Sequence, residues 1–201
     1  MRYDFLVETY ATERMKVVSV WAEFRETDMD FRPRPDDRRG RSVHEHMVHQ
    51  CMSEDAWFRT MLKIDVGAPP LPKIETREQF VLRYVEDSGK RLAELAAKEE
   101  SWWESEASFF DVRRTIAWVM TRRIAHTAHH RGQQMTMLRM LGRDLHSNYG
   151  PTADTGGLMQ NHAPTIYAYR DLESLLEDLD SGANMTALPG AQGAVTERPT
   201  K

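Results

Sequence analysis

Apolar residues recur every three or four positions along most of this chain of 201 residues, and no run alternates between apolar and polar side chains as a half-buried strand does. In the first such stretch the apolar stripe includes Leu6, Tyr10 and Val17. The same spacing predicts four long helices, over about residues 3–24, 42–62, 76–100 and 111–141. We therefore expect an all-α fold without strands, and four long amphipathic helices favour a four-helix bundle.

Short local signals mark where these helices begin and end. Ser42 followed by Glu45 has the spacing of a capping box, and Thr76 followed by Gln79 offers a second capping signal. Gly142 stands where a residue that terminates a helix is expected. The proline-rich segment between the second and third helices is long enough to let the chain cross over instead of turning back as a simple hairpin.

The chain is long enough for one domain with a well-buried core, and we expect that domain to span residues 1–180. Residues 147–164 have the character of a loop, which is often functional when it is this long. A short amphipathic helix around Leu175 is expected to close the domain. Residues 181–201 are poor in large apolar side chains, which predicts a flexible tail.

Charge and composition argue against several classes of protein. A net charge of −4 does not suit a nucleic-acid binder, which needs a basic face to displace counterions. Cys51 is the only cysteine, so no intramolecular disulfide can form and a cytoplasmic location is the default expectation. No apolar run approaches the roughly 18 residues that a membrane span needs, so we expect no membrane partner.

Histidines in two of the predicted helices indicate a metal site. His126 and His130 are four residues apart in the last long helix, so their rings lie on one face and could bind the same ion. The second helix could supply a third imidazole from His46 or His49, and helical spacing alone does not choose between them. His129 points about 100 degrees away from His130, which disfavours it as a ligand of the same ion. Three imidazoles would leave a coordination position open, as in catalytic sites.

The inward stripe of the last long helix is apolar at both ends and polar in the middle. Its residues are Ile116, Val119, Arg123, His126, His130, Gln133, Met137 and Met140. A polar centre in a core-facing stripe is costly unless its groups are paired, and a metal with its hydrogen-bonded surroundings would supply that pairing. Glu13 and Arg14 interrupt the first stripe at a comparable height and are candidates to face the same region. Gly132 is expected to permit close helix packing next to the site.

These residues also carry a family resemblance. The chain resembles the DinB/YfiT-like superfamily of metal-dependent bundle proteins over roughly residues 1–145, and segments in 147–158 extend the likeness toward residue 170. The matching features are His49 in a helix opened by Ser-x-x-Glu, then Trp57-Phe58, then His126-x-x-x-His130-Arg131-Gly132-Gln133. The resemblance implies an up-down-down-up four-helix bundle with a C-terminal loop extension, often a homodimer. It also implies a divalent metal held by His49, His126 and His130.

Such a site can support more than one chemistry. A divalent ion with an open position lowers the pKa of bound water toward about 7 or stabilises a thiolate. Thr127 stands where zinc peptidases of the His-Glu-x-x-His type carry their general base, which argues against a peptidase. The superfamily includes transferases and isomerases that use low-molecular-weight thiols, so the resemblance favours thiol S-transfer with such a thiol as the small-molecule substrate.

Two alternatives stay open beside the thiol transferase. One is a stress-response protein that binds a metal without turnover, and the other is a metal-dependent hydrolase. No catalytic residue is assigned, although Glu13, Glu45 and Glu54 are candidates for proton transfer, and Tyr149, Asp154 and His162 are candidates for a lid. The ion itself is also open among Zn, Ni, Mn and Fe, with Cu a further option for imidazole ligands.

Overall fold

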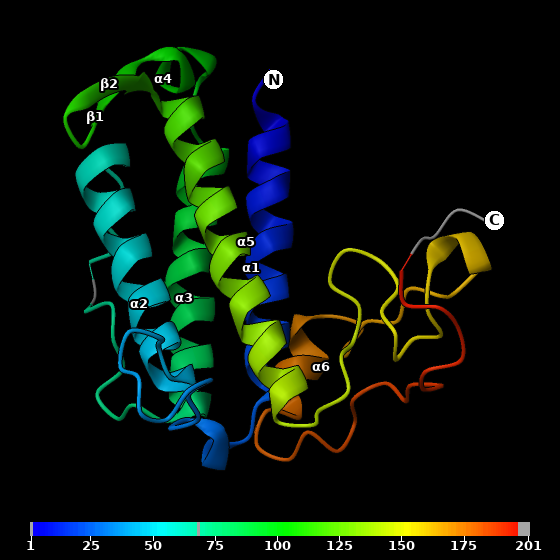
Figure 1. The fold of residues 1–201 in the computed structure, drawn as a ribbon. Coiled ribbons are helices and arrows are strands. Elements are labelled where there is room, and N and C mark those ends of the chain that lie inside the picture. The colour runs from blue at the N-terminus through cyan, green and yellow to red at the C-terminus, as the bar shows by residue number, and fades with distance from the viewer. Residues whose placement is uncertain (1, 68, 197–201) are drawn as a thin grey trace.

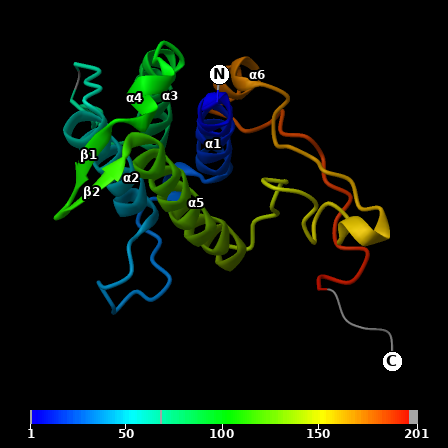
Figure 2. The same cartoon turned by 90° about the horizontal axis from the view of Figure 1, so that it is seen from above.

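Four long helices form the core of the computed structural model, which describes residues 2–67 and 69–196. They are α1 (Asp4–Glu23), α2 (Val43–Trp57), α3 (Arg77–Ala96) and α5 (Ile116–Met140). Helix α1 packs against α3 and α5, and α2 packs against the same two helices. Figure 1 shows that α2 and α3 run in one direction and α1 and α5 in the other, and Figure 2 shows the group from above. No helix in the described part of the chain combines the length and apolar character of a membrane span.

Helices α2 and α3 begin where their capping residues predict. The Ser42 hydroxyl accepts a hydrogen bond from the Glu45 backbone N–H, and the Glu45 carboxylate accepts one from the Ser42 N–H. Thr76 caps α3 in the same way through the Gln79 N–H. A short 3₁₀ helix, η1 (Glu26–Asp28), lies between α1 and α2, and α2 continues directly into a π-helical turn, η2 (Phe58–Leu62). The described parts of the connection, residues 63–67 and 69–76, then return along the outside to the start of α3, as in a crossover (Figure 1).

The core consists of two apolar clusters separated by a polar layer. One cluster contains Val17, Met47, Tyr84 and Leu138, among others, and the second contains Leu6, Phe58, Leu95 and Val119. Along each long helix, buried polar side chains lie between the residues of the two clusters: Glu13 in α1, Glu54 in α2, Arg91 in α3 and Arg123 in α5. The polar layer therefore crosses the whole group of helices at one height.

The expectation of a fold without strands is wrong in one place. After the short helix α4 (Glu100–Glu104), strands β1 (Glu106–Phe109) and β2 (Val112–Thr115) pair as an antiparallel hairpin. Helix α5 accordingly begins at Ile116, after the cap Thr115, and not near residue 111. The turn places Phe110 at φ 53°, a left-handed conformation that β-hairpin turns need and that glycine or asparagine usually provides. The sequence lacks that signal, so the hairpin was not visible from it.

The chain after α5 forms an extension that packs beside α1 (Figures 1 and 2). It contains the 3₁₀ helix η3 (Met159–Asn161) and the short helix α6 (Leu172–Glu177), and Leu175 joins the core cluster of α1. The first part of the expected tail makes hydrogen bonds here, from the Thr186 N–H to the Ala168 carbonyl and from the Gly190 N–H to the Asp154 carbonyl. Residues 197–201 lie outside the described residues, and the flexibility of the tail stays a prediction.

His146 connects this extension to α1 and makes the stability of the fold depend on pH. Burial alone would lower its pKa, but contacts with the Glu23 carboxylate, 3.6 Å from Nδ1, and with the Thr186 carbonyl outweigh burial and raise the pKa. A histidine with a raised folded-state pKa stabilises the fold while it is protonated. Its contribution is complete below the ordinary pKa of about 6.5 and is lost as pH rises through the folded-state value.

We therefore expect His146→Gln to reduce the free energy of unfolding more at about pH 5.5 than at about pH 8.5. Urea unfolding of the parent and the variant at both pH values measures the difference. The matched control is His162→Gln, because His162 is an exposed histidine of the same extension. A loss of stability that is the same at both pH values would contradict the prediction.

Candidate metal centre

Three histidine rings meet on the seam between α2 and α5. The Nε2 atom of His130 lies 3.1 Å from Nε2 of His49 and 3.2 Å from Nε2 of His126. All three ligand atoms lie within 4.8 Å of one another. Two nitrogens bound to the same tetrahedral zinc ion are about 3.3 Å apart, because each Zn–N bond is about 2.0–2.1 Å long. The two distances to His130 match this value, and the structure therefore brings the three predicted ligands together.

The protonation of these rings suits metal binding. Gln133 Oε1 lies 3.0 Å from Nδ1 of His130 and accepts a hydrogen bond from it in the tautomer that carries its proton on Nδ1, which leaves the lone pair of Nε2 facing the other two rings. Burial, followed by the nearby charges, lowers the pKa of His130 to about 3 and that of His126 to about 4. Burial also lowers the pKa of His49, with Arg41 as the next cause. Neutral imidazole is the form that binds a metal ion, so these three rings are in the metal-binding form at neutral pH.

The remaining histidines of the two helices lie around the cluster. His46 is buried one turn before His49, and its ring centroid lies 5.6 Å from that of His130, but it is not among the three converging ligands. The side chain of His129 is exposed and only touches the edge of His130. His44 pairs with Glu75 on the surface. Geometry thus selects His49, the choice that helical spacing had left open.

An aromatic group covers one end of the cluster. Trp57, the last residue of α2, stacks on His126 with ring centroids 5.7 Å apart and an interplanar angle of 29°. Phe109 and Phe110 of the hairpin meet Trp57 edge-on, at 5.2 and 6.3 Å. The hairpin that the sequence did not reveal thus contributes a wall beside the candidate site. The π-helical turn begins immediately after Trp57, and such turns are frequent at functional sites.

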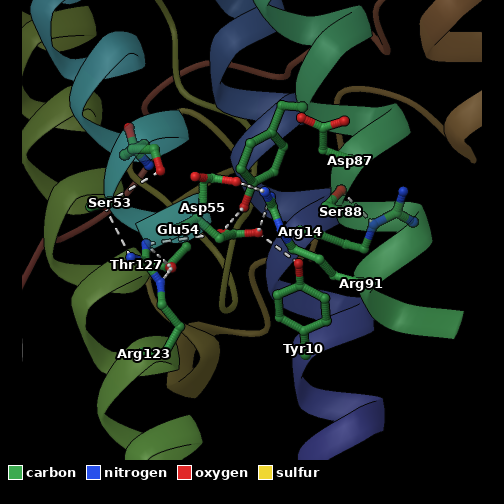
Figure 3. Close-up of polar contacts among 12 residues, drawn as sticks. Tyr10, Arg14, Ser53, Glu54, Asp55, Asp87, Ser88, Arg91, Arg123 and Thr127 are labelled. Carbon is green, nitrogen blue, oxygen red and sulfur yellow. Dashed lines mark hydrogen bonds and ion pairs between the residues drawn. The ribbon is translucent and has the colours of Figure 1, made fainter. Parts of the chain in front are cut away.

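A buried network of hydrogen bonds and ion pairs makes up the polar layer (Figure 3). Glu54 is fully buried, accepts hydrogen bonds from the hydroxyls of Tyr10 at 2.6 Å and Tyr84 at 3.0 Å, and pairs with Arg91 at 3.4 Å and Arg123 at 3.8 Å. Burial, with the charge of Glu54 as the next cause, raises the pKa of both tyrosines, so they remain hydroxyl donors. Sequence reasoning named Glu54 only as one candidate among three. Of its four partners, which come from three other helices, only Arg123 had been marked as part of a polar centre, and no local pattern linked the four to Glu54.

The network also reaches the histidine seam. The Arg123 guanidinium donates hydrogen bonds to the hydroxyls of Thr127 and Ser53, and its centre lies 5.6 Å from the centroid of the Trp57 ring (Figure 3). Thr127 follows His126 directly, and Trp57 stacks on the His126 ring. The buried charges therefore support the residues that hold His126, without entering the histidine cluster themselves.

Of the two candidates in α1, only Glu13 faces this region. It pairs with Arg131 at 2.6 Å and accepts a hydrogen bond from the Tyr149 hydroxyl at 3.0 Å. Arg14 instead points to α3, where it donates to the Ser88 hydroxyl and the Val85 carbonyl (Figure 3). Arg131 is the residue after His130, so Tyr149 connects the extension to the backbone beside a candidate ligand.

The other loop candidates lie elsewhere. Asp154 pairs with Arg139 near the end of α5, and His162 is exposed with no described contact to the histidine cluster. Gly132 is also exposed, and a Cβ atom added to it would meet no described atom within 4 Å outside its own helix. The expectation that Gly132 permits close packing is therefore wrong, because its face of α5 points to solvent.

Comparisons with known proteins agree with this architecture. In the structural comparison, a DinB-like protein from Bacillus cereus matches with a TM-score of 0.59 at 14% identity, over 68% of this chain and 91% of that chain. A DinB-like protein from Bacillus subtilis matches with a TM-score of 0.53 at 14% identity, over 70% of this chain and 94% of that chain. At such identities the likeness concerns the fold alone. The curated proteins include no match.

Comparison of the sequence with known protein families gives a more specific assignment. Residues 5–157 match the DinB family, a span that runs from α1 through the histidine cluster and into the extension. The matched span contains all three converging histidines and the hairpin beside them. The chain belongs to the DinB family.

Proposed function

We propose that this protein binds one divalent metal ion through His49, His126 and His130, and that the site catalyses transfer of a thiol group. The observation that carries the proposal is the convergence of the three Nε2 atoms, with His130 oriented by Gln133. Three protein ligands leave a position free for a substrate, as in catalytic zinc sites. When bound, the ion supplies positive charge that favours the thiolate form of a thiol.

The surroundings of the histidines favour thiol transfer over hydrolysis. In the described residues, no hydrogen bond or ion pair joins any of the three histidines to a carboxylate. Glu13 and Glu54 are engaged by arginines, and Glu45 pairs with Arg32. A hydrolase of this kind usually needs a general base beside the activated water, whereas a thiol loses its proton far more readily than water does. Trp57 shields one side of the site from solvent and offers an apolar surface to a substrate.

Turnover by the zinc-loaded full-length protein tests the proposal. With cysteine as the thiol and monochlorobimane as the acceptor, a carbon–sulfur bond forms while chloride and a proton are released, and adduct fluorescence reports the rate. We expect a rate above the uncatalysed reaction that His130→Ala abolishes and His44→Ala retains. A metal-loaded protein without thiol turnover would instead support a non-catalytic role, and cleavage of 4-nitrophenyl acetate without thiol would support a hydrolase.

We also propose a helix topology, an oligomeric state and a cellular location for this protein. The opposed directions of the helix pairs in Figure 1 support an up-down-down-up four-helix bundle. The family resemblance implies a homodimer, and sedimentation of the full-length chain tests it. The single cysteine, Cys51, is buried and free, which is compatible with the reducing cytoplasm that we propose as its location.

A further inference from the structure

A second hollow lies on the same seam as the histidine cluster. It has a volume of about 280 Å³ and is lined on one side by Arg41 and His46 and on the other by Gln133, Thr136 and Met137. His46 comes three residues before His49 and Gln133 three residues after His130, so on both helices the hollow is displaced by about one turn from the candidate ligands. One turn of helix rises about 5.4 Å, a distance that a small substrate can span.

Arg41 gives this hollow a positive charge that no described side chain neutralises. Arg39, which also lines the hollow, forms an ion pair with Asp37, and Arg32 of the same loop forms one with Glu45. Within residues 2–67 and 69–196, Arg41 has neither an ion pair nor a hydrogen bond. Arg41 is therefore the arginine of this lining whose charge has no described partner.

A neutral group in the hollow also has a donor to offer. Gln133 uses its amide oxygen to accept from His130, which leaves its NH₂ group available to a ligand. His46 also lines the hollow, and its side chain is 4% exposed.

We propose that this hollow binds the carboxylate of a small thiol whose sulfur occupies the histidine site. Arg41 supplies the charge, and Gln133 supplies an amide donor. The inference rests on the proposed function, because the sulfur position is that of the substrate there. Gln133 has a double role in this arrangement, since one end of its amide orients His130 and the other end faces the substrate. Charge-assisted hydrogen bonds to carboxylate are about twice as strong as neutral ones, so this contact discriminates between acidic and neutral thiols.

Cobalt-substituted full-length protein provides a direct test. Thiolate binding to cobalt gives a near-ultraviolet charge-transfer absorption, and 3-mercaptopropionate can be titrated beside its neutral counterpart 3-mercaptopropionamide. We expect the parent to bind the acid about tenfold more tightly than the amide, the factor that one net charge-assisted hydrogen bond provides. In Arg41→Gln the preference should fall to within about twofold while the affinity for the amide is unchanged. Arg38→Gln, which removes an exposed arginine of the same loop outside the hollow, should keep the preference of the parent.

The outcomes separate this inference from the proposed function. Equal affinity for acid and amide in the parent would overturn the carboxylate site while leaving the thiol site intact. An equal loss of preference in Arg41→Gln and Arg38→Gln would overturn the assignment to Arg41. Visible cobalt absorption without a thiolate band for either thiol would contradict the thiol chemistry itself, and with it the carboxylate site.

Discussion

Replacing Glu54 with alanine is expected to lower the free energy of unfolding by about 3–5 kcal/mol, which is the cost of breaking a buried ion pair by removing one partner. The carboxylate is fully buried, and the variant would leave Arg91 and Arg123, both at most 2% exposed, without their shared counter-charge. The hydroxyls of Tyr10 and Tyr84 would lose their acceptor at the same time. Urea unfolding of the parent and the variant measures the change.

The control is Glu86→Ala, because Glu86 forms a surface ion pair with Lys90 on α3. Exposed pairs of this kind contribute at most about 1 kcal/mol, so this variant should remain close to the parent. Glu54→Gln keeps the shape of the side chain and should fall between the two. If Glu54→Ala and Glu86→Ala cost the same, the polar layer does not have the structural role that we assign to it.

Loss of any one of the three converging histidines is expected to reduce zinc affinity by about two orders of magnitude or more. A structural zinc site with four ligands has an apparent binding free energy of about 10–16 kcal/mol, so each ligand accounts for about 2.5–4 kcal/mol. The variants are His49→Ala, His126→Ala and His130→Ala. Gln133→Ala should cost less, about 10- to 100-fold, because Gln133 orients His130 without binding the ion.

Competition with a chromophoric zinc chelator measures these affinities. The matched control is His44→Ala, since His44 belongs to the same helix as His49 but pairs with Glu75 on the surface. We expect this control to bind zinc as the parent does. A parent-like affinity in His126→Ala or His130→Ala, or a loss in His44→Ala as large as theirs, would show that the ion binds elsewhere.

Much of the fold was predictable because it rests on local signals. The capping residues Ser42 and Thr76 and the helical spacing of apolar residues act within a few positions, so the starts of α2 and α3 follow from the sequence. The hairpin was not predictable in this way. Its turn at Phe110 lacks the usual glycine or asparagine, and the contact between Phe109 and Trp57, which joins segments far apart in the chain, becomes visible only in three dimensions.

The candidate site was likewise predictable from local spacing only in part. His126 and His130 share a helix, so their spacing predicts that the rings lie together. The choice between His46 and His49 depends on how α2 is rotated against α5, which spacing within one helix does not determine. The predicted polar stripe of α5 proved to be two features, a fully buried layer with Arg123 and a partly buried seam with the histidines. The four partners of Glu54 come from three other helices, and only packing brings them together.

The central claim is that one ion is bound by the Nε2 atoms of His49, His126 and His130, and crystals grown with zinc test it most directly. An anomalous difference map at the zinc edge should show a peak at about 2.0–2.1 Å from all three nitrogens, with a further position open to solvent. The same map from His130→Ala crystals should lack this peak. A parent map with no peak on the seam of α2 and α5, or with its peak at other residues, would contradict the account.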